Sequence, residues 1–172
     1  GTGVGPADAE GLESEAALRR QDTYKNGDAG SDDVSDLKLR SKTYLVGTFQ
    51  DEKADFSQTY KANGTTVKDT TLFWYETSTA GVLARASSAA TEAALREQHT
   101  YRNGTEGSVT VVATDLKSKT YLVGDFQEER AKYSQNYRIG GISVKDTTLF
   151  YYELGTGVGP ADAEGLESEA AL

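Results

Sequence analysis

Apolar and polar residues alternate along much of the chain, and turn-forming residues separate the alternating runs. Residues 42–49, 56–61 and 65–76 are rich in Thr, Tyr, Val and Phe, and Asn63-Gly64 lies between the last two runs. A period of two is typical of strands with one buried face, and a turn pair between two such runs is typical of a hairpin. The pattern predicts a mainly β chain made of antiparallel hairpins.

The alternating runs occur twice because the chain contains an internal repeat. Residues 18–76 align without a gap on residues 95–153, and about 35 of the 59 aligned pairs are identical. We call these stretches repeat A and repeat B; matching positions in them are 77 residues apart. The sequence predicts tandem antiparallel, hairpin-rich modules with a period of 77 residues, each sandwich-like.

The two ends of the chain are also copies of each other. Residues 1–18 and 155–172 share the sequence GTGVGPADAEGLESEAAL. We therefore interpret 1–17 and 77–94 as linkers, and 154–172 as the start of the next repeat. A natural array of near-identical units and an engineered duplication both account for the copied ends.

The segment before each module could be a helix or a strand. Ser14 to Gln21 and Thr91 to Gln98 begin with Ser or Thr followed by Glu and Ala, which favours a short helix. Their apolar stripe is thin, so an added strand is the alternative. Residues 51–60 also permit a helix, since Phe56 and Tyr60 are four residues apart. An α+β fold is therefore the alternative fold class.

Turn residues and charge predict how the strands are joined. Asn63-Gly64 predicts a type I′ turn, in which both central residues have positive φ, and Gly140-Gly141 meets that requirement in repeat B. Residues 108–113 read as a strand, whereas the matching residues 31–36 are acidic. We interpret 31–36 as an edge strand whose charge prevents free pairing.

Bulky side chains occupy consecutive positions near the end of each repeat. Consecutive positions of a strand point to opposite faces, so we expect both faces of this strand to be buried. A module of this size without a disulfide has little core of its own, so these side chains should pack between modules. They are Leu72, Phe73, Trp74 and Tyr75 in repeat A, and Leu149, Phe150, Tyr151 and Tyr152 in repeat B.

Composition narrows the classes of partner. A net charge of -9 argues against binding to nucleic acid or to an anionic membrane. No stretch approaches the roughly 18 apolar residues of a membrane span, so membrane insertion is not expected. The chain has no cysteine, which excludes disulfides and thiolate chemistry.

Candidate chemistry is sparse, and the sequence predicts neither an enzyme nor a cofactor. His99 is the only histidine, Asp22 replaces it in repeat A, and a lone surface histidine cannot form a triad or a metal cluster. The acidic run 28–36 suggests calcium, but no glutamate closes a twelve-residue loop, so a charged edge is the favoured interpretation. Asn63 and Asn103 each begin Asn-Gly-Thr, the acceptor pattern for N-linked glycans, and both are expected at exposed tips.

Part of repeat B resembles a known scaffold family. The stretch Lys119-Thr120-Tyr121-Leu122-Val123 and the stretch from Tyr137 to Val144, with its Gly-Gly pair, are similar to the small C-terminal domain of phycobilisome rod linkers. The resemblance implies a strand, a helix and a final strand, and a scaffold role in light-harvesting assemblies. Repeat A departs from it, with Asn63-Gly64 at the Gly-Gly position.

Three functions are compatible with these patterns. We favour a structural tandem-repeat protein: a building block of an extracellular fibre, stalk or surface filament whose partner is itself, as neighbouring repeats or other chains. The second is a repeat binding or adhesion module that gains avidity from its copies. The third is an intracellular scaffold linker.

Overall fold

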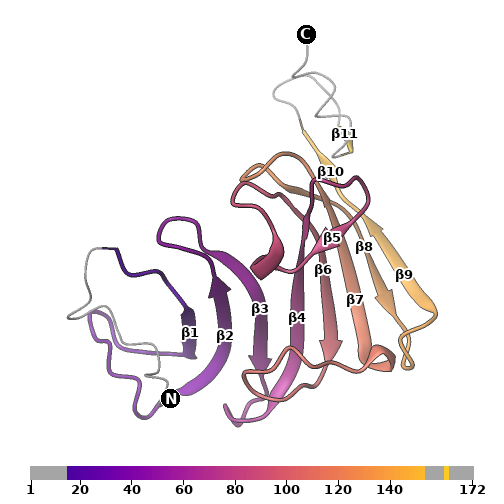
Figure 1. Cartoon of the computed structure of the whole chain (residues 1–172). Helices are drawn as coiled ribbons and strands as arrows, with labels where there is room; N and C mark the ends of the chain where they lie inside the picture. Colours follow the sequence, from indigo (N-terminus) through magenta and orange to yellow (C-terminus); the bar gives the residue numbers. More distant parts are fainter. Residues whose placement is uncertain (1–14, 154–160, 163–172) are drawn as a thin grey trace.

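The computed structural model describes residues 15–153 and 161–162, which are mainly β (Figure 1). They form one antiparallel sheet of nine strands and a separate two-stranded sheet. The strands are β1 (Arg20–Lys25), β2 (Lys38–Val46), β3 (Lys53–Tyr60), β4 (Val67–Glu76), β5 (Leu83–Ala84), β6 (Leu95–Arg102), β7 (Leu116–Val123), β8 (Arg130–Tyr137), β9 (Val144–Leu149), β10 (Tyr151–Tyr152) and β11 (Ala161–Asp162).

The strands of the large sheet lie side by side nearly in chain order. The order is β1-β2-β3-β4-β6-β7-β8-β9, with β5 paired to β4. Figure 1 shows a single curved layer that runs from β1 at one end to β9 at the other. β4 and β6 belong to different repeats and pair directly. The described residues of both repeats therefore share one sheet, and the two facing sheets of a sandwich are not what they form.

The strand register recurs between the repeats. Tyr44 on β2 pairs with Phe56 on β3, and Tyr121 on β7 pairs with Tyr133 on β8 at the matching positions. Both ring pairs are stacked, with centroids 4.2 and 4.3 Å apart. Cross-strand aromatic pairs stabilise a sheet beyond the area that they bury.

The segments before the repeats, for which the sequence left a short helix and an added strand open, lead into strands. Residues 20–25 pair with β2 as β1, and residues 95–102 pair with β4 and β7 as β6. The described residues contain only two short 3₁₀ helices, η1 (Ala86–Ser88) and η2 (Ala113–Asp115). A short segment with a thin apolar stripe gains more from ladder bonds to neighbouring strands than from an isolated helix. Residues 53–60 are likewise strand β3, so the α+β alternative is wrong.

The predicted strands at 31–36 and 108–113 are wrong, because 31–36 and 108–112 lie in loops and Ala113 begins η2. In the first loop, Ser35 N donates to Asp33 Oδ1 at 2.9 Å. Local bonds of this kind compete with ladder pairing. In repeat B, part of the loop is held by bonds to repeat A, described below.

The hairpin turn between β3 and β4 forms, but it is not type I′. Gly64 has a φ of 74°, whereas Asn63 is not among the residues with positive φ. The Asn63 side chain instead accepts bonds from the Thr65 and Thr66 amides at 3.2 and 3.1 Å. This side-chain bonding closes the turn with one left-handed residue rather than two. In repeat B both Gly140 and Gly141 have positive φ.

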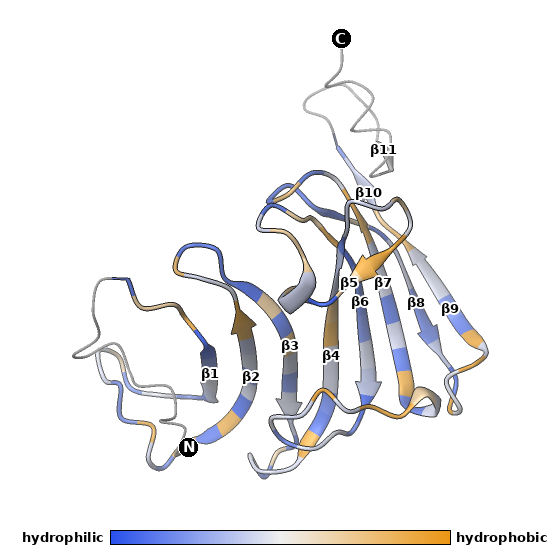
Figure 2. Ribbon diagram, in the orientation of Figure 1, coloured by the Kyte–Doolittle hydropathy of each residue, from blue (hydrophilic) through white to orange (hydrophobic). Residues whose placement is uncertain are grey.

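The main apolar cluster lies where β4 meets the connecting segment 77–94. Tyr75, Ala86 and Ala93 are buried there, and Val46, Phe73, Ala89 and Leu95 pack against them. In Figure 2 the short strand β5, which pairs with β4, has the colour of hydrophobic residues. Arg85 also ties this segment to repeat A through an ion pair with Asp55 at 2.9 Å. The segment interpreted as a linker thus supplies part of the core.

Most of the copied ends lies outside the described residues. Two residues of the second copy form β11, in which Ala161 pairs with Tyr152. The pairing matches that of Ala84 on β5 with Tyr75 on β4. Tyr75 also pairs with Leu95 on β6, so β5 must lie on the opposite edge of β4, beside β3.

Candidate functional site: the junction of β4 and β6

The two repeats meet along the whole length of β4. The ladder runs from Asp69, which pairs with Arg102, to Tyr75, which pairs with Leu95. Asn103 N donates to Lys68 O at 2.8 Å just beyond one end of the ladder. The backbone of the junction is therefore paired along the ladder, with one register shift between Trp74 and Tyr75, and similar shifts occur inside each repeat.

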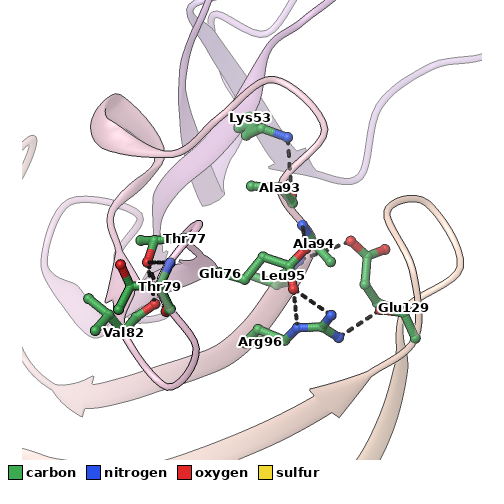
Figure 3. A network of polar contacts seen from close by, with 11 residues as sticks. Lys53, Glu76, Thr77, Thr79, Val82, Ala93, Ala94, Leu95, Arg96 and Glu129 are labelled. Carbon is green, nitrogen blue, oxygen red and sulfur yellow. Dashed lines mark hydrogen bonds and ion pairs between the residues drawn. The ribbon is translucent and has the colours of Figure 1, made fainter.

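Polar side chains of β4 bond to side chains of β6 and β7 across the junction. The Thr71 and Thr100 hydroxyl oxygens are 2.9 Å apart. Lys117 Nζ lies 2.8 Å from Asp69 Oδ2. Arg96 binds Glu76 Oε2 through Nε at 2.8 Å and Nη2 at 2.5 Å, and Figure 3 shows this two-point contact. Such charge-assisted pairs fix the register as well as adding stability.

Arg96, on β6, also contacts the turn between β7 and β8. Its Nη1 donates to Gly124 O at 2.6 Å, while Leu95 N donates to Glu129 Oε1 at 2.9 Å. These contacts hold the start of β6 against the β7–β8 turn of its own repeat. The bond to Gly124 O therefore helps to orient the Arg96 guanidinium toward Glu76.

The loop after β6 folds back over one face of repeat A. Gln58, which has no exposed surface, donates from Nε2 to Thr105 O at 2.9 Å and to Ser108 O at 3.3 Å. Its Oε1 accepts from Gly107 N at 2.9 Å. A buried amide that is bonded at both ends makes the loop a specific cover for repeat A, because each partner would be unsatisfied without it.

A glycine allows this loop to approach β4 closely. Gly104 has a φ of 143°, and a Cβ atom there would lie 2.2 Å from Thr70 Oγ1. Thr70 has no exposed surface, and its hydroxyl donates to Asn103 O at 2.9 Å. Asn103-Gly104 therefore serves as a contact site between repeats rather than as a hairpin turn.

Lys53 is buried at the meeting point of repeat A, the connecting segment and repeat B. It donates to Ala93 O at 3.3 Å, and its Nζ lies 4.2 Å from the centre of the Phe126 ring (Figure 3 shows the bond to Ala93). Burial lowers the pKa of Lys53, and Glu129 partly opposes the shift. A buried lysine with these partners links three parts of the chain.

His99 lies in the junction and not on the surface, contrary to the sequence-based expectation. Its ring is 5.6 Å from the Trp74 ring, and Nε2 is 2.5 Å from Glu97 Oε2. Burial lowers the pKa of His99, and the bond to Glu97 works against that shift. The position is therefore a packing site whose charge state depends on the junction.

The eight bulky residues predicted to pack between modules fall into two groups. In repeat A, Leu72 and Tyr75 are buried, and Phe73 and Trp74 are half-buried on the strand that pairs with β6. In repeat B, Leu149 and Tyr151 are exposed, and Phe150 and Tyr152 are half-buried. The repeats thus differ at positions where their sequences nearly agree.

The two predicted glycan acceptors are exposed at the same end of the sheet. Asn63 lies in the turn after β3, and Asn103 directly follows β6. β3 and β6 both pair antiparallel with β4, so their C-terminal ends lie at the same end of the sheet along the strand direction. Asn63 Nδ2 also donates to Thr66 Oγ1 at 2.7 Å.

Other candidate chemistry is limited in the part of the chain that the structure describes. No group of three or more His, Asp or Glu residues among the described positions is placed to hold a metal ion. Within the same residues, no helix is long and apolar enough to cross a bilayer.

No protein family model, curated protein or solved structure matches the chain. The residues of repeat B that resemble phycobilisome rod linkers include Tyr121 on β7 and the Gly-Gly pair before β9. Between them lies strand β8, at the place where the resemblance implies a helix.

Proposed function

We propose that the chain is a structural repeat protein, a building block of an extracellular fibre, stalk or surface filament. In this proposal each repeat is a module of four strands, and successive modules join edge to edge within one sheet. The pairing of β4 with β6 carries the proposal, because it continues the antiparallel order found inside each repeat. An array of such units gains stability from every junction that it adds.

The polar character of the junction suits a protein that has open edges. β1 presents charged residues along its length, including Arg20, Asp22 and Lys25. A charged edge resists pairing with unrelated strands, yet it can pair with an edge that offers matching partners. The β1 end of an array would therefore resist pairing with unrelated strands and accept only a matching edge.

Chains with two, four and six repeats test the proposal. We expect the free energy of unfolding and the urea m-value to rise with each added repeat, since each repeat buries surface against its neighbour. Small-angle scattering and electron microscopy should show the sheet growing by about 19 Å per repeat, from four strands roughly 4.8 Å apart. Repeats that unfold independently at one midpoint, joined as separate globules, would contradict it.

Glycosylation is an expected part of the extracellular role. Asn63 and Asn103 lie at one end of the sheet, where attached glycans would not block pairing along its edges. After secretion from a glycosylating cell, intact mass should show two glycans on the wild-type chain. Asn63→Gln and Asn103→Gln should each remove one. A wild-type chain with the mass of the unmodified polypeptide would mean that glycosylation does not support an extracellular location.

A repeat binding module is the second candidate function. Phe49 and Phe126 occupy matching positions in the β2–β3 and β7–β8 turns, and they are 41% and 37% exposed. Exposed aromatic residues repeated along a sheet can bind sugars with avidity. Binding to a glycan panel that rises with repeat number and weakens in Phe49→Ala would favour this role over a purely structural one.

A further inference from the structure

β1 and β9 are the outer strands of the nine-stranded sheet, at opposite ends of the layer (Figure 1). Within the described residues no strand pairs with the outer edge of either one. Their counterparts 77 residues away are β6 and β4, which pair with each other at the junction. Each end of the described sheet therefore carries one half of a junction whose complete form is present in the middle of the sheet.

The half carried by repeat B is exposed where its counterpart is buried. Leu72 is 4% exposed and Leu149 is 57% exposed. Val67 and Val144 differ in the same way, at 5% and 41%. The apolar edge of repeat B is thus in the state that repeat A would have if β6 and its loop were removed.

The residues that lead into β1 of repeat A make the same contacts as the residues at the start of β6 in repeat B. Arg19 Nη1 donates to Gly47 O at 2.6 Å, as Arg96 does to Gly124. Leu18 N donates to Glu52 Oε1 at 2.9 Å, as Leu95 does to Glu129. The start of β1 is therefore held in the position that lets Arg96 meet Glu76 in the complete junction.

The loop after β1 has nearly the same φ angles as the loop after β6, which covers repeat A. Asn26 and Gly27 have φ values of 64° and 147°, against 62° and 143° for the matching pair after β6. Gly30 has a φ of 79°, against 71° at its counterpart. The loop after β1 of another copy therefore has the backbone conformation needed to bind Gln135, as the loop after β6 binds Gln58.

Charges at the two halves are complementary. The counterpart of the Glu76–Arg96 pair is Glu153 with Arg19, and that of Asp69–Lys117 is Asp146 with Arg40. The threonine pair recurs as Thr148 with Thr23. Two contacts of the internal junction have no equivalent. Glu106 Oε1 accepts a bond from Lys42 Nζ at 2.5 Å, but its counterpart is Ala29, and the His99 ring, which lies beside Trp74, is replaced by Asp22. Association through these halves should therefore be weaker than the internal junction.

We propose that β9 and β10 of one chain bind β1 of a second copy of this chain, in the register of β4 and β6, so that copies join head to tail. In this register Asp146 pairs with Lys25, Thr148 with Thr23, and Tyr152 with Leu18. β11 does not block the edge, since its register matches that of β5, which lies on the inner side of β4. The inference rests on the proposed function and names its partner as a separate copy.

Engineered cysteines test the register, because the chain has no cysteine of its own. Closely opposed residues of antiparallel strands have Cα atoms about 4.5 to 5.5 Å apart, within the range for a disulfide. We would mix chains carrying Thr23→Cys with chains carrying Thr148→Cys in a glutathione redox buffer. Non-reducing electrophoresis should show mainly mixed dimers, and much less cross-linking when Lys25→Cys replaces Thr23→Cys.

Each outcome decides the matter. Dimers formed by Thr23→Cys alone would show that β1 edges meet each other, and monomers throughout would show that the edges do not meet; either result overturns the inference. Thr71→Cys/Thr100→Cys is the internal control, whose disulfide should form within one chain. If that control forms and the mixed dimer does not, the inference fails while the proposed function stands. If the control fails, the proposed function fails as well.

Charge reversal provides a second measurement. By sedimentation velocity at high protein concentration, we expect Arg19→Glu and Glu153→Arg each to reduce association at least tenfold. The double variant Arg19→Glu/Glu153→Arg should recover most of it, because the charges are again opposite between copies. Failure of the double variant to recover, with thermal unfolding unchanged from the single variants, would argue against this register.

Discussion

Leu72 on β4 and Leu149 on β9 occupy matching positions in the two repeats, but Leu72 is 4% exposed and Leu149 is 57% exposed. Both lie in the same local sequence, Val-Lys-Asp-Thr-Thr-Leu-Phe. β4 has strands on both sides and a loop over its face, whereas among the residues that the structure describes β9 pairs only with β8. The burial of this leucine is therefore determined by the next strand in the sheet and not by its own repeat.

Truncating the two leucines should have unequal effects. Leu72→Ala removes buried methyl groups beside the junction and should destabilise the protein by about 2 to 4 kcal/mol. Leu149→Ala should change the free energy of unfolding by roughly 0.5 kcal/mol or less in dilute protein, since its side chain already contacts water. Urea unfolding monitored by circular dichroism measures both, and equal losses would show that β9 is covered in solution.

Gln58 should be more important than its counterpart Gln135. Gln58→Ala leaves the Gly107 amide and the carbonyl groups of Thr105 and Ser108 without their partner, at a cost of about 1 to 3 kcal/mol. Hydrogen exchange at the Gly107 amide should also accelerate as the loop detaches. The matched variant Gln135→Ala is expected to be close to neutral. An unchanged exchange rate at Gly107 would mean that the amide bond does not hold the loop.

Comparing alanine substitutions at Gly104 and Gly27 distinguishes the cost of backbone strain from the cost of a steric clash. Both have φ near 145°, so alanine strains the backbone at either position by about 1 to 3 kcal/mol. Only at Gly104 would the added Cβ lie 2.2 Å from Thr70 Oγ1, whereas at Gly27 the nearest atom is Leu37 Cδ1 at 3.7 Å. Gly104→Ala should therefore be clearly more destabilising than Gly27→Ala in thermal unfolding. Similar losses would show that the loop does not pack on β4.

The mainly β character could be read from the sequence because it depends on local alternation. Phe56 and Tyr60 fit both a strand and a helix, and ladder bonds on both sides of β3 decide for the strand. The segments before the repeats were harder, since Ser and Thr followed by Glu are typical of a helix start. Their pairing with strands distant in sequence is a tertiary effect that local propensity does not report.

The junction could be predicted only in part. The bulky run 72–75 indicated a strand buried by its neighbours, and it does lie on the strand that pairs with β6. Gln58 and Gly104 were missed, although each is identical in the other repeat. A polar residue kept at an inward position of a strand is the signal that would have found Gln58. The difference in exposure between the repeats could not be predicted, because it depends on where the sheet ends.

His99 and Trp74 offer a pH-dependent measure of the junction, and each is the only residue of its type in the chain. Burial lowers the pKa of His99 below its ordinary value of 6.5; the bond to Glu97 opposes this shift, and the charge of Lys119 adds to it. The unfolded chain therefore binds a proton at higher pH than the folded one. The associated stability is present above about pH 6.5 and is lost as pH falls through the folded pKa.

A titration by NMR should give one histidine signal with a pKa below 6.5, and Trp74 fluorescence should change with the same midpoint. In urea unfolding, the wild-type chain should lose stability as pH is lowered from 7, and His99→Gln should remove that part of the slope. Lys119→Gln is the matched control, and it should move the pKa of His99 upward by a small amount. A measured pKa at or above 6.5 would contradict the prediction, because burial of His99 would then not outweigh its bond to Glu97.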